Sequence, residues 1–174
     1  MADFQKSKSI GKFGENLVIN YLRLGNIEVS PNSDKETRSF HDLDCKIGAK
    51  RFTVEVKLDF LAAKTGNMAI EISNTKTGAD SGLSVTKSTL WAVLVKDEEN
   101  WVIFLTKTES LRDFIKNHKG REFKGAGDGN ATLLLYKMAD IIHIFRRIDN
   151  LGKLVDGVMD YSDIGKTVKN LLKL

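Results

Sequence analysis

Two neighbouring stretches decide how this chain is interpreted: Phe40-His41-Asp42-Leu43-Asp44 and, after a turn at Gly48, Phe52-Thr53-Val54-Glu55-Val56-Lys57. Both alternate apolar and polar residues, as half-buried β-strands do. The alternation predicts strands over residues 40–47 and 52–58 that pair as a hairpin. One face of this hairpin is apolar, and the other carries carboxylates and Lys57. Such a face can hold a divalent cation and activate a water molecule.

Pairing of these strands brings carboxylates together, because Asp42 and Asp44 precede Glu55 on the adjacent strand. Like charges side by side destabilise a sheet unless a cation neutralises them, and carboxylate oxygens suit Mg²⁺ or Mn²⁺. Lys57 is then placed to orient an attacking water or to neutralise charge on phosphorus. Both aspartates share the predicted face, so either fits. A solvated hairpin in which Lys57 offsets Glu55 is the alternative interpretation.

The Glu-x-Lys tripeptide is by itself a weak signal, because exposed strands often alternate acidic and basic residues. The chain contains a second copy, Glu122-Phe123-Lys124, beside a glycine-rich segment and without a preceding acidic strand. We interpret this second copy as ordinary surface. It serves as an internal control for the first.

Apolar residues at helical spacing predict a helix over residues 10–24, with Glu15 near its N-terminal turn. An acid at that position is favoured by the helix dipole alone. Alternatively, Glu15 points at the hairpin and holds a second cation, directly or through water. A second open question is Glu71, on a predicted strand over residues 68–72, which either reaches the same sheet face or decorates an edge.

Further elements follow from hydrophobic periodicity and turn residues. We expect strands over 27–29, 90–95, 101–105 and 131–136, and helices from Thr108 or Ser110 to 118, over 137–148 and over 162–174. The segment 76–89, rich in Gly, Ser and Thr, is expected to be a loop. The segment 120–130 contains four glycines and is expected to be a flexible connection.

Bulk properties narrow the class of protein. With 174 residues and 41% hydrophobic content, we expect a single domain over 1–174, with a core at about 10–148 and a C-terminal helical tail at about 150–174. The net charge of +4 permits a polyanionic partner without proving one. A single cysteine, Cys45, excludes an internal disulfide, and no apolar run is long enough to span a bilayer. These features predict an unprocessed cytoplasmic protein with no membrane association.

The order Glu15, Asp42, Glu55, Lys57 resembles the PD-(D/E)XK nuclease superfamily over roughly residues 10–105, in particular its small Holliday-junction-resolvase-like and phage-type members. The resemblance implies an α/β (α+β) fold with a restriction-endonuclease-like core, a central mixed β-sheet flanked by helices. It implies Asp42 and Glu55 as metal ligands, joined by the Val56 carbonyl and by Glu15 as an accessory acid, and Lys57 as the catalytic lysine. Asp42 matches the motif better than the alternative ligand Asp44. His41 stands where the superfamily name places Pro.

By this resemblance the protein is expected to be a Mg²⁺-dependent DNA endonuclease, with Mn²⁺ as a substitute cofactor and branched DNA as one candidate substrate. A phage-encoded origin stays open. Residues expected to contact DNA phosphates are basic or hydroxyl-bearing: Lys12, Arg51, Lys76, Ser81, Thr86 and Lys87. A plain solvated loop is the alternative for the segment that holds the last four.

A homodimer is expected, because cutting two strands needs two active sites. The C-terminal helix after Ser162 could dock on its own core or on a second subunit. Two rival functions remain at this stage. One is a non-catalytic nucleic-acid-binding protein that retains the nuclease fold, and the other is a partner-binding α/β domain whose acidic hairpin is decoration.

Overall fold

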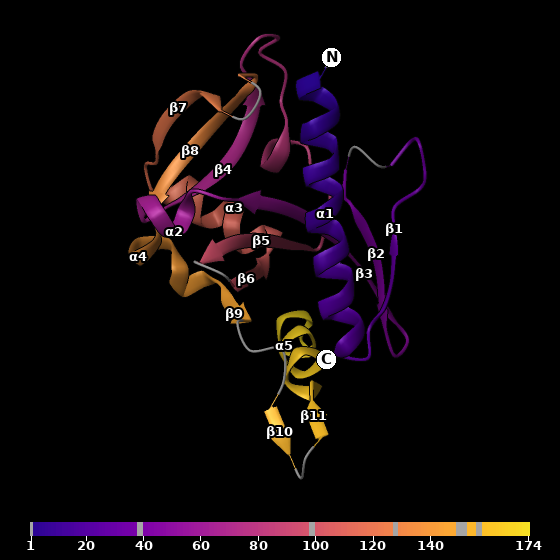
Figure 1. Ribbon diagram of the computed structural model, residues 1–174. Coiled ribbons are helices and arrows are strands. Elements are labelled where there is room, and N and C mark those ends of the chain that lie inside the picture. The colour runs from indigo at the N-terminus through magenta and orange to yellow at the C-terminus, as the bar shows by residue number, and fades with distance from the viewer. Residues whose placement is uncertain (1, 38–39, 98–99, 127–128, 149–152, 156–157) are drawn as a thin grey trace.

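The computed structural model describes residues 2–37, 40–97, 100–126, 129–148, 153–155 and 158–174 (Figure 1). Its α-helices are α1 (Ala2–Leu24), α2 (Ala62–Thr65), α3 (Thr108–Asn117), α4 (Met138–Ile141) and α5 (Ser162–Leu172), and its short 3-10 helices are η1 (Gly82–Ser84) and η2 (Ile142–Ile144). The strands are β1 (Glu28–Pro31), β2 (Leu43–Ile47), β3 (Lys50–Asp59), β4 (Asn67–Asn74), β5 (Leu90–Asp97), β6 (Asn100–Lys107), β7 (Arg121–Ala126), β8 (Ala131–Lys137), β9 (Arg146–Ile148), β10 (Lys153–Val155) and β11 (Val158–Asp160). The fold is therefore mixed α/β.

A six-stranded sheet organises the molecule, in the order β1-β2-β3-β5-β6-β9. It is a mixed sheet, because β3 and β5 run parallel while its other neighbouring strands are antiparallel. The predicted acidic hairpin is present as β2 and β3, with Leu43 opposite Val54 and Cys45 opposite Phe52. Gly48 turns the chain between them with a φ of 60°, a left-handed conformation that glycine adopts without steric cost.

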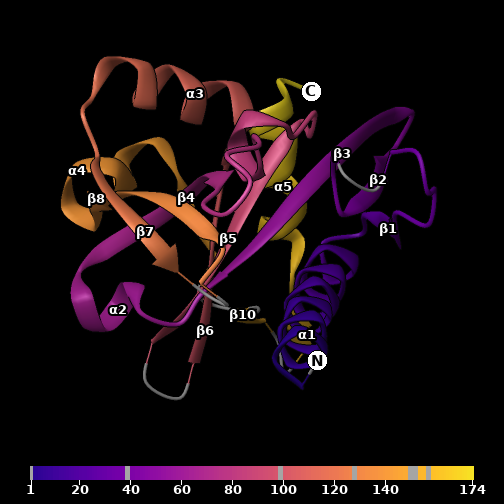
Figure 2. The ribbon, with the colours of Figure 1, turned by 90° about the horizontal axis from the view of Figure 1, so that it is seen from above.

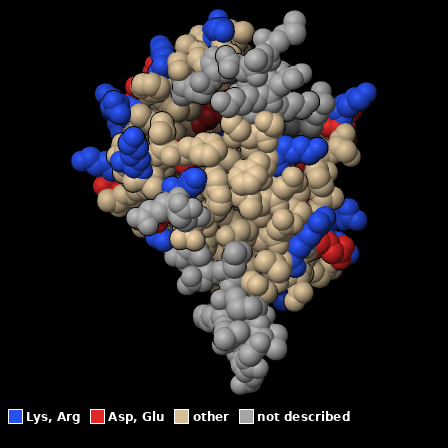
Figure 3. Space-filling view, viewed as in Figure 1, with Lys and Arg blue, Asp and Glu red and all other residues tan. Residues whose placement is uncertain are grey.

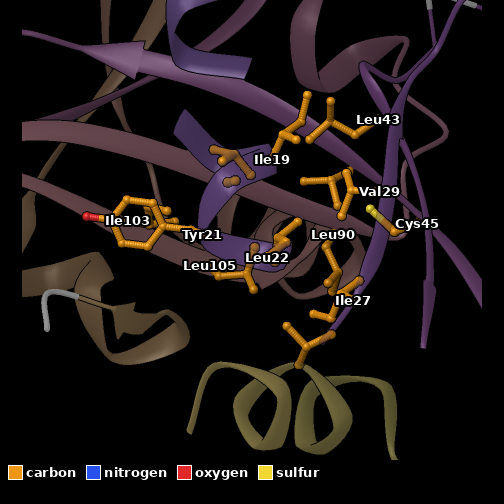
Figure 4. Packing of buried hydrophobic residues seen from close by; sticks show 14 of the residues in the cluster. Ile19, Tyr21, Leu22, Ile27, Val29, Leu43, Cys45, Leu90, Ile103 and Leu105 are labelled. Carbon is orange, nitrogen blue, oxygen red and sulfur yellow. The ribbon is translucent and has the colours of Figure 1, made fainter. Parts of the chain in front are cut away.

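Both faces of this sheet are covered, each by a different layer. Figure 2 shows α1 on one side of β3 and β5, and α3 with the smaller sheet on the other. On the α1 side, buried aliphatic residues of α1, β2, β3 and β5 pack with Ile164 and Val168 of α5 (Figure 4). On the other side, Trp91 and Val93 of β5 pack against Met68 and other residues of the smaller sheet and α3. Alternate residues of β5 thus enter different cores, whereas the buried apolar residues of β3 enter the core on the α1 side.

The smaller sheet has three antiparallel strands in the order β4-β8-β7. The predicted strand 68–72 is part of β4, but it belongs to this sheet and not to the sheet of the acidic hairpin. The expected flexible connection over 120–130 was wrong for its first half, because residues 121–126 form β7 and pair with β8. Tertiary pairing overrides the glycine content there.

Two other expectations are corrected at the C-terminal third. The helix predicted over 137–148 is divided into α4, η2 and β9, because Arg146 to Ile148 pair with β6 and extend the central sheet. The tail from about 150 is not all helical, because β10 and β11 pair as a short hairpin before α5. α5 docks on its own chain, where Ile164 and Val168 are buried. Among the described helices, none combines the length and apolarity needed to cross a membrane.

Candidate active site

The site begins where β2 and β3 stop pairing. β2 starts at Leu43, opposite Val54, so the part of β3 beyond Val54 has no neighbour on that edge. Asp42 fills the position just before β2: its backbone N–H donates to the Val54 carbonyl at 3.0 Å, and its Oδ2 accepts the Val56 N–H at 2.7 Å. The N–H and C=O of a strand residue point to the same edge, so the Val56 carbonyl also faces Asp42.

Glu55 and Lys57 project from β3 to the face opposite α1. Glu55 is only 8% exposed, and its Oε1 lies 3.0 Å from the Lys57 ammonium. The same ammonium lies 3.4 Å from Glu71 Oε2 on β4. Ser81 in turn donates a hydrogen bond to Glu71 Oε1 at 2.7 Å. Lys57 therefore joins a carboxylate of the central sheet to one of the smaller sheet. Glu71, although it lies on a different sheet, thus reaches the face of β3 that carries Glu55 and Lys57.

Thr86 ties the segment before Asp42 to Glu55. Its buried hydroxyl lies 2.7 Å from the Phe40 carbonyl and 3.3 Å from Glu55 Oε2. One hydroxyl proton can serve one of these acceptors at a time. The Thr86 hydroxyl therefore lies within hydrogen-bond distance of both arms of the acidic hairpin and can donate to either of them.

Glu15 approaches from the first helix. α1 packs on β3, and a Cβ at Gly14 would lie 1.7 Å from the Leu58 Cδ1 atom. The absence of a side chain at Gly14 thus allows the helix to come close to β3. Glu15 is half-buried, and burial raises its pKa, which the charge of Lys12 lowers and that of Glu55 raises. Glu15 and Glu55 are therefore close enough to interact.

Burial also raises the pKa of Asp42 and of Glu55. The charge of Glu15 further raises the pKa of Asp42, and the charge of Asp42 further raises the pKa of Glu55. At Lys57, burial and the neighbouring charges act on the pKa in opposite directions. Burial alone would lower its pKa, but the charges of Glu55, Glu71 and Asp42 outweigh burial and raise it above its ordinary value. The ammonium accordingly stays charged at neutral pH. We name Glu15, Asp42, Glu55, Lys57 and Glu71 the acidic cluster. Three of its four carboxyl groups, those of Glu55, Glu71 and Asp42, act on the charge of Lys57, and Glu15 adjoins Glu55.

Asp44, the alternative ligand, lies elsewhere. It pairs opposite Thr53, one strand out from Glu55 and two residues before it. Its side chain is 55% exposed and contacts His41 Nε2 at 3.1 Å. Asp42 therefore faces the acidic cluster and Asp44 faces solvent, because β2 begins between them and the chain changes direction there.

The acidic cluster suits a hard divalent cation. Within the described part of the chain, no three His, Cys, Asp or Glu side chains lie close enough to hold an ion unaided. Mg²⁺ needs fewer, because it keeps several waters and uses one or two carboxylates together with substrate phosphates. Asp42 and Glu55 could provide those oxygens. Their pKa values are raised mainly because burial disfavours the charged forms, and a cation would stabilise those forms.

The residues expected to bind DNA separate into two groups. Ser81 and Thr86 hold carboxylates of the acidic cluster, and the backbone N–H of Lys87 donates to Phe40 while its ammonium lies 4.0 Å from the Phe40 ring centroid. Lys12 is exposed one turn before Glu15.

The remaining two residues of that set lie apart from the cluster. Lys76 is exposed in the turn after β4, and Arg51 is exposed at the far end of the hairpin. Arg51 is about 13 Å along β3 from Glu55 at the usual rise per strand residue.

Sequence reasoning missed the role of Gly14, although a glycine inside a helical pattern is itself a signal of close packing.

The second Glu-x-Lys copy lies on β7. Lys124 contacts Glu122 at 3.1 Å, nearly the same distance as in the first copy, but the two side chains are 65% and 53% exposed. Alternation on one strand is enough to form this ion pair.

A cavity of about 790 Å³ opens beside the acidic cluster, and both Lys57 and Glu71 line it. Figure 3, in the view of Figure 1, shows acidic atoms recessed in a hollow between the smaller sheet and α1.

Comparison of the chain with protein-family models, with curated proteins and with solved structures finds no match. Its function has to be argued from the site.

Proposed function

We propose that this protein is a divalent-metal-dependent nuclease that hydrolyses phosphodiester bonds in DNA. The observation that carries the proposal is the Asp42 carboxylate held on the Val56 N–H at 2.7 Å, beside a buried Glu55 and a charged Lys57. Carboxylates and a lysine placed together in this way serve phosphoryl transfer, where charge develops on phosphate oxygens and a water must attack.

Asp42 and Glu55 would hold the cation, with the Val56 carbonyl and Glu15 as further oxygen donors. A bound Mg²⁺ supplies polarisation of a phosphoryl oxygen and a lowered pKa for bound water. Asp42 is oriented by its hydrogen bond from Val56, and Glu55 by Lys57 and Thr86. Orientation by neighbouring donors is what a metal site requires of its ligands.

Lys57 acts in this proposal as a cation and not as a general base, because its pKa is raised and it keeps its proton. Its ammonium has three donors, two of which are directed at Glu55 and Glu71. The third can orient the attacking water or stabilise charge on the phosphoryl oxygens. Glu71 is then a positioning residue that keeps Lys57 in place.

The order of elements supports the same proposal. A helix bearing Glu15 is followed by the antiparallel pair β2 and β3, with Asp42 just before β2 and with Glu55 and Lys57 on β3. β3 then runs parallel to β5. This order resembles the PD-(D/E)XK core. A resolvase-like preference for branched DNA and a homodimer belong to the proposal as extensions of that resemblance.

The test is cleavage of plasmid, branched and single-stranded DNA with Mg²⁺ or Mn²⁺, and with EDTA as the blank. Glu55→Gln is expected to abolish cleavage, and Glu122→Gln, the same change in the exposed copy, is expected to leave it intact. Cleavage by Glu55→Gln at the wild-type rate would refute the proposal. Salt-dependent binding without turnover in the wild type would favour a non-catalytic nucleic-acid-binding protein.

A further inference from the structure

The smaller sheet has an apolar face that is not packed on the core. In its register, Ala69 lies beside Leu135 and Arg121, and Glu71 lies beside Leu133 and Phe123. These residues alternate with Met68, Ile70 and Tyr136, which enter the core on the other face. An antiparallel sheet covered on one side usually presents polar residues on its open side. This sheet instead presents mostly apolar ones.

The open face forms one wall of the 790 Å³ cavity, and Phe60 and Leu61, at the end of β3, form another part of the lining. Three large apolar side chains of this lining are strongly exposed: Phe60 at 47%, Leu61 at 61% and Phe123 at 46%. The volume lies in the range of cavities that hold small organic ligands. An exposed apolar concavity of this kind marks a binding surface.

The charges at this cavity indicate what it binds. Lys57 and Glu71 of the acidic cluster line one side, and Arg121 lines it from β7, with an apolar floor between. Asp59 also belongs to the lining, but its carboxylate accepts hydrogen bonds from the backbone N–H groups of Leu61, Ala62 and Ala69. Two cations separated by apolar side chains suit a chain that alternates phosphates with flat aromatic groups. The cavity is also continuous with the proposed cleavage site, because Lys57 belongs to both.

We infer that this cavity binds unpaired nucleotides of the DNA substrate, with bases against Phe123, Phe60 and Leu133 and the adjoining phosphate directed towards Lys57. The inference rests on the proposed nuclease function, because the acidic cluster is what identifies the occupant as nucleic acid. In a duplex the base faces are stacked on one another and hidden, so they cannot contact the apolar side chains of the cavity. A single strand presents those faces to aromatic and aliphatic side chains. The substrate class is therefore DNA with a single-stranded segment at the cleavage site.

The experiment measures binding by fluorescence anisotropy in EDTA, so that no cleavage occurs. The probe is a fluorescein-labelled single strand of about 16 nucleotides, the upper end of compact single-strand sites, and the competitor is a duplex of the same sequence. Phe123→Ala is expected to weaken single-strand binding by about tenfold, and Phe123→Tyr to preserve it. Leu24→Ala, which removes another exposed apolar side chain at the end of α1, is the matched control and is expected to bind as the wild type does.

Arg121→Gln supplies a second variant that leaves the apolar floor intact. It is expected to weaken binding and to reduce the slope of log affinity against log salt by about 0.7, the value for one phosphate contact on a single strand. Thermal unfolding of each variant confirms that the fold is retained.

Three sets of results would overturn the inference, and they are distinguishable. If the wild type cleaves DNA with Mg²⁺ while Phe123→Ala and Arg121→Gln bind the single strand unchanged, the cavity is not the nucleotide site and the nuclease proposal survives. A sedimentation shift in Phe123→Ala with unchanged binding would assign this face to a second copy of the chain. If the wild type neither cleaves nor binds DNA, the proposed function fails and the inference fails with it.

Discussion

The two Glu-x-Lys copies have almost the same internal geometry and different surroundings. Glu55 and Lys57 are 3.0 Å apart, and Glu122 and Lys124 are 3.1 Å apart. In the first copy the side chains are 11% and 29% exposed, and in the second 53% and 65%. The ion pair therefore reflects strand alternation alone. What separates the copies is burial and the carboxylates that other elements bring to the first.

This difference has an energetic consequence. An exposed ion pair contributes about 0–1 kcal/mol, because water screens it and both side chains lose rotational freedom. A buried charge depends on its partners, because removing one leaves the other without compensation. Lys57 has partners on two sheets, Glu55 on β3 and Glu71 on β4. The same substitution should therefore have unequal effects in the two copies.

The largest expected effect is on catalysis by Lys57→Met, compared with Lys124→Met. Loss of the ammonium removes the donor proposed for the attacking water or the phosphoryl oxygens, and losses of such donors typically cost about 10²–10³ in rate. Lys124→Met should cleave at nearly the wild-type rate. Single-turnover cleavage of plasmid DNA with Mg²⁺ measures both, and equal rates in the two variants would remove the distinction between the copies.

A second expected effect is on stability, in the same two variants. Lys57→Met leaves Glu55 and Glu71 without their shared cation and should lower the free energy of unfolding by about 2 kcal/mol, less than a fully buried pair would lose because Lys57 is partly exposed. Lys124→Met should change it by less than about 0.5 kcal/mol. Urea unfolding at neutral pH without metal distinguishes them. A loss of similar size in both would mean that burial of the first copy carries no energetic weight.

Thr86→Val tests another difference between the two Glu-x-Lys copies. The first copy is in contact with the buried Thr86 hydroxyl, whereas the second lies at the surface. The variant keeps the shape of the side chain and removes the group that contacts Phe40 and Glu55. We expect about a tenfold loss of activity and about 1 kcal/mol of stability, the value of one hydrogen bond, with recovery in Thr86→Ser. Wild-type activity in Thr86→Val would show that Glu55 needs no internal support.

The smallest expected effect is a gain of stability in Asp42→Asn. Burial raises the pKa of Asp42 above the ordinary value of an aspartate, so the folded state holds this proton to higher pH than the unfolded state does. Stability from this group is present at low pH and is lost as pH rises from about 3.8 through the raised folded value. Removing the charge while keeping an oxygen for the Val56 N–H should raise the melting temperature at neutral pH by about 2–4 °C.

The control for this change is Asp44→Asn, which alters an exposed carboxyl two residues further along the chain. Because its contact with His41 is at the surface and worth little, the melting temperature of this variant at neutral pH should stay close to that of the wild type. A calorimetric series from pH 3 to pH 7, in roughly unit steps, separates the two variants. A lower melting temperature in Asp42→Asn at neutral pH would contradict the interpretation of Asp42 as a strained, ionised ligand.

Much of the hairpin could be predicted from the sequence, because alternation assigns Glu55 and Lys57 to one face of β3 and Gly48 marks the turn. The choice of Asp42 over Asp44 could not follow from alternation, which places both on one face. It depends on where β2 begins, and strand boundaries depend on pairing that is not local. The same holds for Glu71, whose strand belongs to a second sheet that meets Lys57 only in the folded chain.

Two features were not predicted because they lie in segments whose composition is typical of loops. The glycines between 120 and 130 favoured a loop, yet Arg121 to Ala126 gain partners along β8. Thr86 was expected to contact phosphate because it lies in a polar segment. It is instead buried, in contact with Phe40 and Glu55, which are distant in sequence, and with the nearby Ser88. Short-range patterns therefore predicted the shared face of Glu55 and Lys57 better than the residues that position these side chains.

Titration of Mn²⁺ into the metal-free protein by calorimetry tests the central claim most directly, because it asks whether the first copy and its surroundings form a cation site. We expect binding in the wild type and in Asp44→Asn and Glu122→Gln, with loss of at least about tenfold in affinity in Asp42→Asn, the usual scale for disturbing a metal site. Binding by Asp42→Asn equal to that of the wild type would contradict the account.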